Sequence, residues 1–204
     1  MKILILYYSK YGHTLKMAQA VRQGAQSVDD IEVIFRRAPE FPEDQQKIFN
    51  DKYAKPVWEA QKDISVCTLD DFRQADGMIL GSPTRYGNMT AQLKRVIDST
   101  AELWLEGAFE GKPVGLFTST ATTHGGQETT LLSMMIPLLH LGMIIVGVPY
   151  SVPGMLHTEG RGGTPYGAST VAGADNSLQP TPEDLEIAKA LGKRVAQSAL
   201  KQKS

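Results

Sequence analysis

Apolar runs alternate with segments of helical periodicity along this chain. Residues 2–8 form a continuous apolar run, and Leu15, Ala18, Val21 and Ala25 follow at helical spacing, which predicts a strand and then a helix. Four later runs predict further strands, at residues 31–35, 77–81, 113–117 and 143–148. Apolar strands that alternate with helices predict a doubly wound α/β fold, a five-stranded parallel sheet with helices on both faces.

Helix-start signals support the same plan. Thr68 and Asp71 have the spacing of a capping box, and Thr181 with Pro182 opens the last helix with a hydroxyl cap and a first-turn proline. Two more helices are expected over residues 91–100 and 127–141. The buried face of the last helix is expected to hold Leu185, Ala188, Leu191 and Val195.

The uncharged segment 131–148 approaches the roughly 18 residues of a membrane helix. Its chemistry divides it, because helix formers reach Leu141, Gly142 is placed as a helix stop, and the β-branched run 143–148 follows. We therefore expect a buried helix and then a buried strand, with no membrane span.

Three segments exceed this minimal plan and are expected to be loop insertions: residues 39–66, 102–112 and 151–180. The last is rich in glycine and proline and is expected to be irregular. Long insertions in compact domains are usually functional loops or interfaces. The length of 204 residues fits one domain, 1–204, that carries these insertions.

Composition excludes several classes of protein. The chain has 21 Lys and Arg against 22 Asp and Glu, and this near-neutral balance argues against nucleic-acid binding, which depends on cationic side chains that neutralise phosphates. The lone Cys67 allows no intrachain disulfide, which indicates a reducing compartment, the cytoplasm, and we expect it to fill space rather than to catalyse. No targeting signal is expected, since the apolar run 3–8 is too short. His157 and Glu159 lack the further ligands that a metal site would need.

Candidate chemistry begins in the loop 9–14, which follows the first predicted strand and runs into a helix. Free backbone N–H groups and the hydroxyls of Ser9 and Thr14 suit an anion. The triphosphate-loop and dinucleotide fingerprints are absent from the sequence, so a terminal monophosphate fits better. The alternative is an ordinary capped turn without a ligand.

Two more polar loops, 82–89 and 118–126, follow the third and fourth predicted strands. Parallel strands end at one edge of the sheet, so the three loops should share a crevice. The aromatic side chain of Tyr86 is suited to contact the flat heteroaromatic ring of a ligand. Each of these loops, taken alone, could equally be an ordinary connection after a strand, without a ligand.

Several motifs now combine into a resemblance. They are residues 7–14 (YYSKYGHT), 81–89 (GSPTRYGNM), 125–128 (GGQE) and 162–168 (GGTPYGA), followed by Ala172 and Gly173. In this order they resemble the WrbA family of flavodoxin-like NAD(P)H:quinone oxidoreductases, in particular members that reduce p-benzoquinone. The resemblance implies a flavodoxin-like fold, bound FMN, NADH or NADPH as electron donor, and a two-electron ping-pong reduction of a small-molecule quinone. It also implies a homotetramer, a dimer of dimers, whose sites are completed by neighbouring subunits.

Carried over by position, the resemblance implies roles for individual residues. The FMN phosphate is expected on Ser9, Lys10, Tyr11, Gly12, His13 and Thr14; the isoalloxazine ring against Pro83, Thr84, Arg85, Tyr86 and Asn88; and its other edge along Ser119, Thr120, Ala121, Thr122 and Thr123. Tyr11 resembles the residue that meets the nicotinamide, Trp104 the aromatic wall of the quinone pocket, and His140 an imidazole that reaches FMN from a neighbouring subunit. No catalytic side chain is expected, because the flavin carries the chemistry.

Alternatives remain at several positions. Trp104 could instead be an interface aromatic and His140 a core histidine. The loop after the fourth predicted strand is one residue longer than is common in the family and has Ala121, Thr122 and His124 where glycines are frequent. The competing functions are a flavodoxin-type electron carrier, which would dock through a charged face, and an FMN-binding regulatory protein. NADH against NADPH, and the physiological quinone, stay open.

Overall fold

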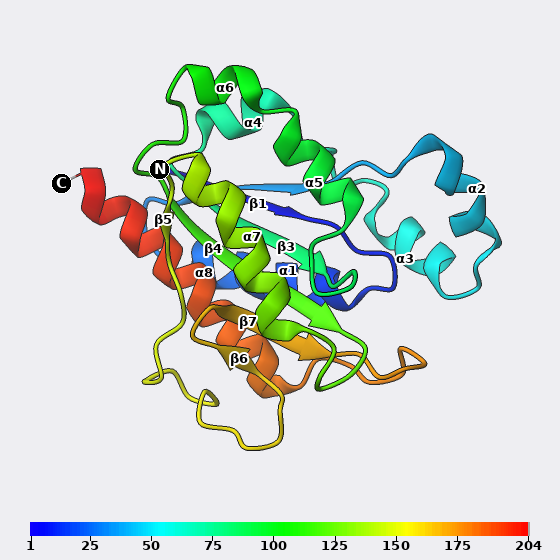
Figure 1. Cartoon of the computed structure of the whole chain (residues 1–204). Coiled ribbons are helices and arrows are strands. Elements are labelled where there is room, and N and C mark those ends of the chain that lie inside the picture. The colour runs from blue at the N-terminus through cyan, green and yellow to red at the C-terminus, as the bar shows by residue number, and fades with distance from the viewer. Residues whose placement is uncertain (204) are drawn as a thin grey trace.

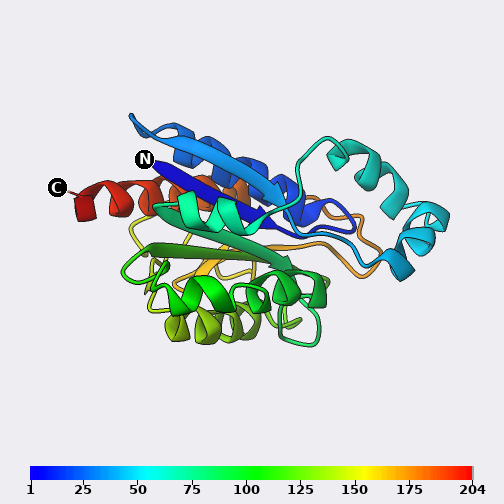
Figure 2. The ribbon, with the colours of Figure 1, turned by 90° about the horizontal axis from the view of Figure 1, so that it is seen from above.

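A single sheet between two layers of helices organises the computed structural model, which describes residues 1–203 (Figures 1 and 2). The strands are β1 Lys2–Tyr7, β2 Glu32–Arg37, β3 Gly77–Pro83, β4 Pro113–Thr120, β5 Ile144–Ile145, β6 Gly163–Thr164 and β7 Gly167–Val171. The helices are α1 His13–Gln26, α2 Pro42–Asn50, α3 Ala54–Gln61, α4 Leu69–Gln74, α5 Ala91–Asp98, α6 Ala101–Leu105, α7 Gln127–His140 and α8 Pro182–Lys203.

Alternation along β1 divides the core. Ile3, Ile5 and Tyr7 face the layer formed by α1 and α8, whereas Leu4 and Leu6 face the layer that contains α4, α5, α6 and α7. All five side chains are fully buried, as expected of a central strand whose successive residues point to opposite faces. The expected α/β sheet covered on both faces is confirmed.

The sheet order is β2-β1-β3-β4-β7-β6, with β5 also paired to β4. All pairs are parallel except the antiparallel β6–β7 hairpin. Strand β1 lies between β2 and β3, and β4 follows β3, an order that is typical of flavodoxin-like sheets. The order places the ends of β1 and β3 side by side in the middle of the sheet, where ligands of such folds bind.

The fifth strand predicted over residues 143–148 is present but much shorter than expected. Only Ile144–Ile145 pairs with β4, at Pro113 and Val114, and the other half of this long edge is covered by β7, which pairs with residues 117–120. The described sheet therefore has seven strands rather than five. The segment 151–180, expected to be irregular, supplies two of them, because β4 is eight residues long and leaves a free edge beyond β5.

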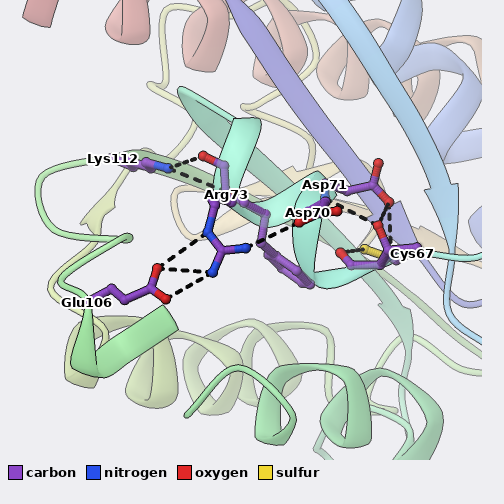
Figure 3. Close-up of polar contacts among 8 residues, drawn as sticks. Cys67, Asp70, Asp71, Arg73, Glu106 and Lys112 are labelled. Carbon is purple, nitrogen blue, oxygen red and sulfur yellow. Dashed lines mark hydrogen bonds and ion pairs between the residues drawn. The ribbon is translucent and has the colours of Figure 1, made fainter. Parts of the chain in front are cut away.

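The segment 39–66 is helical rather than a loop. It holds α2 and α3, which project beyond the carboxyl ends of the strands in both ribbon views (Figures 1 and 2). The segment 102–112 holds most of α6 and is tied to α4, since Arg73 donates to Glu106 at 2.9 Å and Lys112 donates to the carbonyls of Phe72 and Arg73 (Figure 3). These insertions therefore have fixed structure.

Helix boundaries otherwise follow the expected signals. The Thr68–Asp71 capping box is present, and Thr181 and Asp184 bond reciprocally at the start of α8. Ala188, Leu191 and Val195 are fully buried as expected, whereas Leu185 is only half-buried and Ile187 takes the buried place near the start of the helix. The uncharged segment forms α7 and then β5, and within residues 1–203 no helix is both long and apolar enough to cross a membrane.

Candidate functional site

Four chain segments meet in one crevice at the carboxyl edge of the sheet. The strand register brings Tyr7 beside Gly81, Pro83 beside Ser119 and Thr120 beside Val171, so the segments after these strands converge. They enclose a cavity of about 260 Å³. Its walls are Ser9, Lys10, Tyr11, His13, Thr14, Pro83, Thr84, Arg85, Ser119, Thr120, Ala121, Ala172, Ala174 and Asn176. The expected convergence of the three polar loops is confirmed.

The first loop presents hydrogen-bond donors to this cavity. Gly12 is the N-cap of α1 with φ +94°, a left-handed conformation that glycine adopts without strain, and no side chain of the described residues caps this helix start. Ser9 Oγ accepts from the Gly12 N–H at 3.2 Å, which leaves its own hydroxyl hydrogen to donate elsewhere. Thr14 Oγ1 lies 3.1 Å from Ser119 Oγ. Uncapped amides beside buried hydroxyls fit a phosphate group.

Two other residues of the first loop contribute differently. The buried His13 ring places Nε2 at 2.8 Å from the Leu178 carbonyl oxygen, so this nitrogen is the donor. Burial lowers the pKa of His13, and the ring is neutral near pH 7. Its imidazole therefore fastens the 174–178 segment onto α1, and its backbone amide is what a ligand would meet. Lys10 lies over the Tyr11 ring and adds positive charge to the cavity wall.

The second loop is a tight turn that lifts an aromatic ring into solvent. Arg85 and Asn88 bond reciprocally through their backbones at 2.7 and 3.0 Å, and Tyr86 and Gly87 between them have φ +53° and +78°. The Tyr86 side chain is fully exposed. A left-handed tyrosine costs about 1–3 kcal/mol. Pro83, Thr84 and Arg85 line the cavity, whereas Tyr86 and Asn88 do not.

The third loop divides between two cavities. Ser119 and Thr120, expected in the loop, are the last residues of β4, and with Ala121 they line the crevice. Thr122 does not line the crevice, and its carbonyl accepts from Thr120 Oγ1 at 2.8 Å and from the Gly125 N–H at 3.0 Å. Thr123 lines a neighbouring cleft of about 540 Å³ with His124. The structure thus brings three of the five expected residues of this loop into the crevice.

Sequence reasoning missed one wall. Ala172, Ala174 and Asn176 follow β7 and close the crevice beside His13. Gly173 and Asn176 have φ +79° and +61°, the turn geometry that glycine and asparagine favour. Those two residue types were the available signal, but the strand that precedes them could not be recognised from local pattern.

Trp104 and His140 lie together, near the amino end of β4 and away from the crevice at the carboxyl ends of the strands. They line a cavity of about 440 Å³ with residues of α5, α6 and α7. His140 ends α7, and the carbonyl of Gly142 just beyond it accepts from the N–H of Gly111, two residues before β4. A helix of 14 residues spans about 20 Å, so the crevice near its start and His140 at its end do not meet within one chain.

The surface around this second cavity is apolar. We call it the α6–α7 face, made of Trp104, Leu105, Leu132, Ile136, Leu139 and His140. Trp104, Ile136 and Leu139 are each more than half exposed. Exposed large apolar side chains on neighbouring helices are typical of interaction surfaces. The His140 side chain is also exposed, so His140 is not a core histidine.

Cys67 has no place in either cavity. It is half-buried, packs against the cluster that contains Phe72, and donates weakly to the Thr68 carbonyl (Figure 3). Burial raises the pKa of its thiol far above the usual range, so it stays protonated and unreactive. Within residues 1–203 no cluster of three or more His, Cys, Asp or Glu side chains is arranged to hold a metal ion.

Comparison with known families identifies one model over most of the chain. Residues 1–155 match the model described as NADPH-dependent FMN reductase. Two curated relatives are both named NAD(P)H dehydrogenase (quinone). The protein from Solidesulfovibrio magneticus is 44% identical over 197 residues, 96% of each chain, and that from Geotalea uraniireducens is 46% identical over 201 residues, 98% of each chain.

Solved structures share the fold. The flavodoxin, WrbA-like protein from Agrobacterium tumefaciens superposes with a TM-score of 0.65 at 22% identity and 98% coverage of both chains. A flavodoxin from the domain Archaea gives 0.61 at 21% identity, with 98% of this chain and 99% of that chain covered. The chain therefore has a flavodoxin-like fold.

Proposed function

Since this chain belongs to the NADPH-dependent FMN reductase family, we propose that it is an FMN-dependent NAD(P)H:quinone oxidoreductase that converts benzoquinone-like quinones to hydroquinones. The observation that carries the proposal is the crevice itself, where the uncapped start of α1 and the hydroxyls of Ser9, Thr14 and Ser119 surround one cavity. The helix start and the hydroxyls of Ser9 and Thr14 match the phosphate monoester of FMN, and Ser119 would border the ring.

The crevice residues have separate tasks in this proposal. Ser9, Lys10 and Thr14 bind the phosphate together with the amides of residues 9–14. Pro83, Thr84 and Arg85 support the ring from one side, and Ser119, Thr120 and Ala121 border its other edge. FMN, when bound, supplies reversible two-electron hydride chemistry, and the protein orients its reactants.

Part of the ring would lie outside the crevice. The cavity of about 260 Å³ is below the roughly 300–1,000 Å³ of typical small-molecule sites. Tyr86 and Asn88 follow Arg85, which lines the crevice. Contact between the exposed Tyr86 ring and the flavin would account for the left-handed backbone of this residue. We propose that Thr122 and Thr123 approach the ring only through the backbone of their loop.

Donor and acceptor are proposed to use the same open side of the crevice in turn. Tyr11 lies at its wall and would meet the nicotinamide, and the quinone would follow after the oxidised nucleotide has left, a ping-pong order. The proposal covers NADH and NADPH alike.

We also propose a cytoplasmic homotetramer, a dimer of dimers, in which one domain of residues 1–204 forms each subunit. The separation of Trp104 and His140 from the crevice supports this assembly, because both could reach a flavin only in another subunit. The exposed α6–α7 face supports it as well, since association would bury it.

Steady-state oxidation of NADH and of NADPH by FMN-loaded protein, with and without p-benzoquinone, tests the function. The proposal predicts strong acceleration by the quinone and parallel double-reciprocal plots at several quinone concentrations. A rate unchanged by quinone and raised by an added electron-accepting protein would identify a carrier. No turnover with either acceptor would favour a regulatory FMN-binding protein.

A further inference from the structure

The helical segment between β2 and α4 is anchored where it leaves and rejoins the sheet. The Arg37 N–H donates to the Ser65 carbonyl at 3.1 Å and the Cys67 N–H donates to the Arg37 carbonyl at 3.0 Å, which closes the segment at its base. At its start, the buried Glu40 accepts from Tyr8 Oη at 2.5 Å and from Gln92 Nε2 at 2.6 Å. We call residues 42–61, which include α2 and α3, the α2–α3 hairpin.

One buried side chain of the hairpin reaches the phosphate loop directly. Gln61, the last residue of α3, is only 6% exposed, and its Nε2 donates to the Ser9 carbonyl at 2.9 Å. Its Oε1 accepts from Tyr7 Oη at 3.2 Å. A carbonyl can only accept, so the amide orientation is fixed. Burial raises the pKa of Tyr7 far above its usual range, which keeps the donating hydroxyl protonated.

Two further contacts hold the rest of the loop. Tyr11 Oη donates to Asp51 Oδ2 at 3.2 Å, while Asp51 Oδ1 accepts from the N–H groups of Tyr53 and Ala54 at the start of α3. Those backbone bonds lower the pKa of Asp51, so it stays ionised and an acceptor. A Cβ atom on Gly12 would lie 3.2 Å from Val57 Cγ2, so α3 also packs closely on the backbone there.

We propose that the α2–α3 hairpin is a clamp that shapes the phosphate loop, with Gln61 as its positioning residue. An anion site needs its N–H groups turned inward and its carbonyls turned away, because a carbonyl oxygen would repel the phosphate. Gln61 holds the Ser9 carbonyl away from the cavity and satisfies it there. The loop is thereby pre-organised before the ligand binds. This inference rests on the proposed binding of FMN phosphate at residues 9–14.

The test compares two flavins that differ only in the phosphate. Dissociation constants of FMN and riboflavin are measured by quenching of flavin fluorescence on the apoprotein of the wild type and of Gln61→Met. Methionine matches glutamine in length, which limits the disturbance of packing. The wild type should prefer FMN by roughly 100-fold or more. Gln61→Met should reduce that preference about tenfold through weaker FMN binding, with riboflavin affinity unchanged.

A matched control removes the same amide elsewhere on the hairpin. Gln46→Met lies on the exposed side of α2, where the amide contacts Asn50 alone among the described residues, and it should keep the wild-type preference. If Gln61→Met fails to fold, the double variant Tyr7→Phe/Gln61→Met removes both facing polar groups and replaces the single variant in the comparison.

The outcomes separate this inference from the proposed function. A wild-type preference for FMN that Gln61→Met leaves intact overturns the clamp but not the phosphate site. Parallel loss of both flavins in the Gln61 variants also overturns it, since that indicates general damage. A wild type that binds FMN and riboflavin equally well would refute the phosphate site itself and the clamp with it.

Discussion

The crevice and the α6–α7 face differ in the polarity and the solvent exposure of their side chains. In the crevice, Ser9, Thr14 and Ser119 are nearly inaccessible to solvent, and their hydroxyls contact one another or the backbone. On the α6–α7 face, Trp104, Ile136 and Leu139 are more than half exposed and face solvent. The phosphate end of the crevice is formed within one chain, whereas the α6–α7 face is exposed in one chain. We infer that the phosphate of FMN is bound within one subunit, whereas quinone binding depends on the proposed assembly.

Removing the crevice hydroxyls should produce the largest effect. Ser9→Ala combined with Thr14→Ala deletes two donors to the phosphate, each worth about 1.5–3 kcal/mol when the partner is charged, so the FMN dissociation constant should rise roughly 100-fold or more. Flavin fluorescence titration measures it. Ser27→Ala, at the other end of α1, is the control and should bind FMN normally. Unchanged affinity in the double variant would refute the phosphate assignment, and altered assembly would show that the two regions are not independent.

A charge on the α6–α7 face should have the next largest effect. Ile136→Asp places a carboxylate where the proposed association would bury an apolar side chain, so the proposed tetramer should dissociate and quinone turnover should fall roughly tenfold or more. Light scattering and steady-state kinetics measure the two results, while FMN affinity should stay within about twofold of the wild type. Gln197→Asp on the exposed side of α8 should change neither. A tetramer that survives Ile136→Asp would place the interface elsewhere.

Trp104→Ala should have a narrower effect. Loss of an aromatic wall costs about 1.4 kcal/mol, so the KM for p-benzoquinone should rise about tenfold while FMN affinity is unchanged. If FMN affinity fell equally, the indole would be a structural element rather than a wall of the quinone pocket. Dissociation of the tetramer without a separate change in KM would instead identify Trp104 as an interface aromatic.

The smallest expected effect concerns pH. Burial lowers the pKa of His13 below its ordinary 6.5, so in the window below that value the unfolded chain binds the proton more readily than the folded chain. The stabilising contribution of neutral His13 is therefore complete above about pH 6.5 and declines as the pH falls toward the folded pKa. Denaturant unfolding of His13→Gln from pH 5 to 8 should show a weaker loss of stability in acid. The same slope as in the wild type would exclude His13 as the source.

Features that depend on local chemistry can be predicted from the sequence. The expected polar loops meet because β1, β3 and β4 are strongly apolar and their ends are marked by Ser9, Pro83 and Thr120. The extent of the fifth strand could not be predicted, because pairing with β4 depends on distant segments. The β-branched run near residue 144 forms a strand of only two residues, whereas the small-residue segment Gly167–Val171 forms one of five. Local pattern cannot say which segment will find a free edge.

Some site residues can likewise be predicted from the local sequence, and others cannot. The roles of Ser9 and Thr14 could be inferred from a hydroxyl loop that leads into a helix, since the physics of that turn is local. The contribution of Gln61 could not, because it depends on a helix 52 residues away in the sequence that folds back onto Ser9. The resemblance predicts Trp104 at the quinone pocket and His140 at the FMN of a neighbouring subunit, and within one subunit both lie apart from the crevice.

Mixing two defective variants tests the division most directly. Ser9→Ala/Thr14→Ala protein keeps Trp104 but lacks a functional crevice, whereas Trp104→Ala protein keeps the crevice but lacks the wall. The two are unfolded together, refolded with FMN and assayed for NADH oxidation at low p-benzoquinone concentration. Mixed tetramers should regain a low-KM quinone activity that neither parent has. Activity equal to the weighted sum of the two parents would contradict a site shared between subunits.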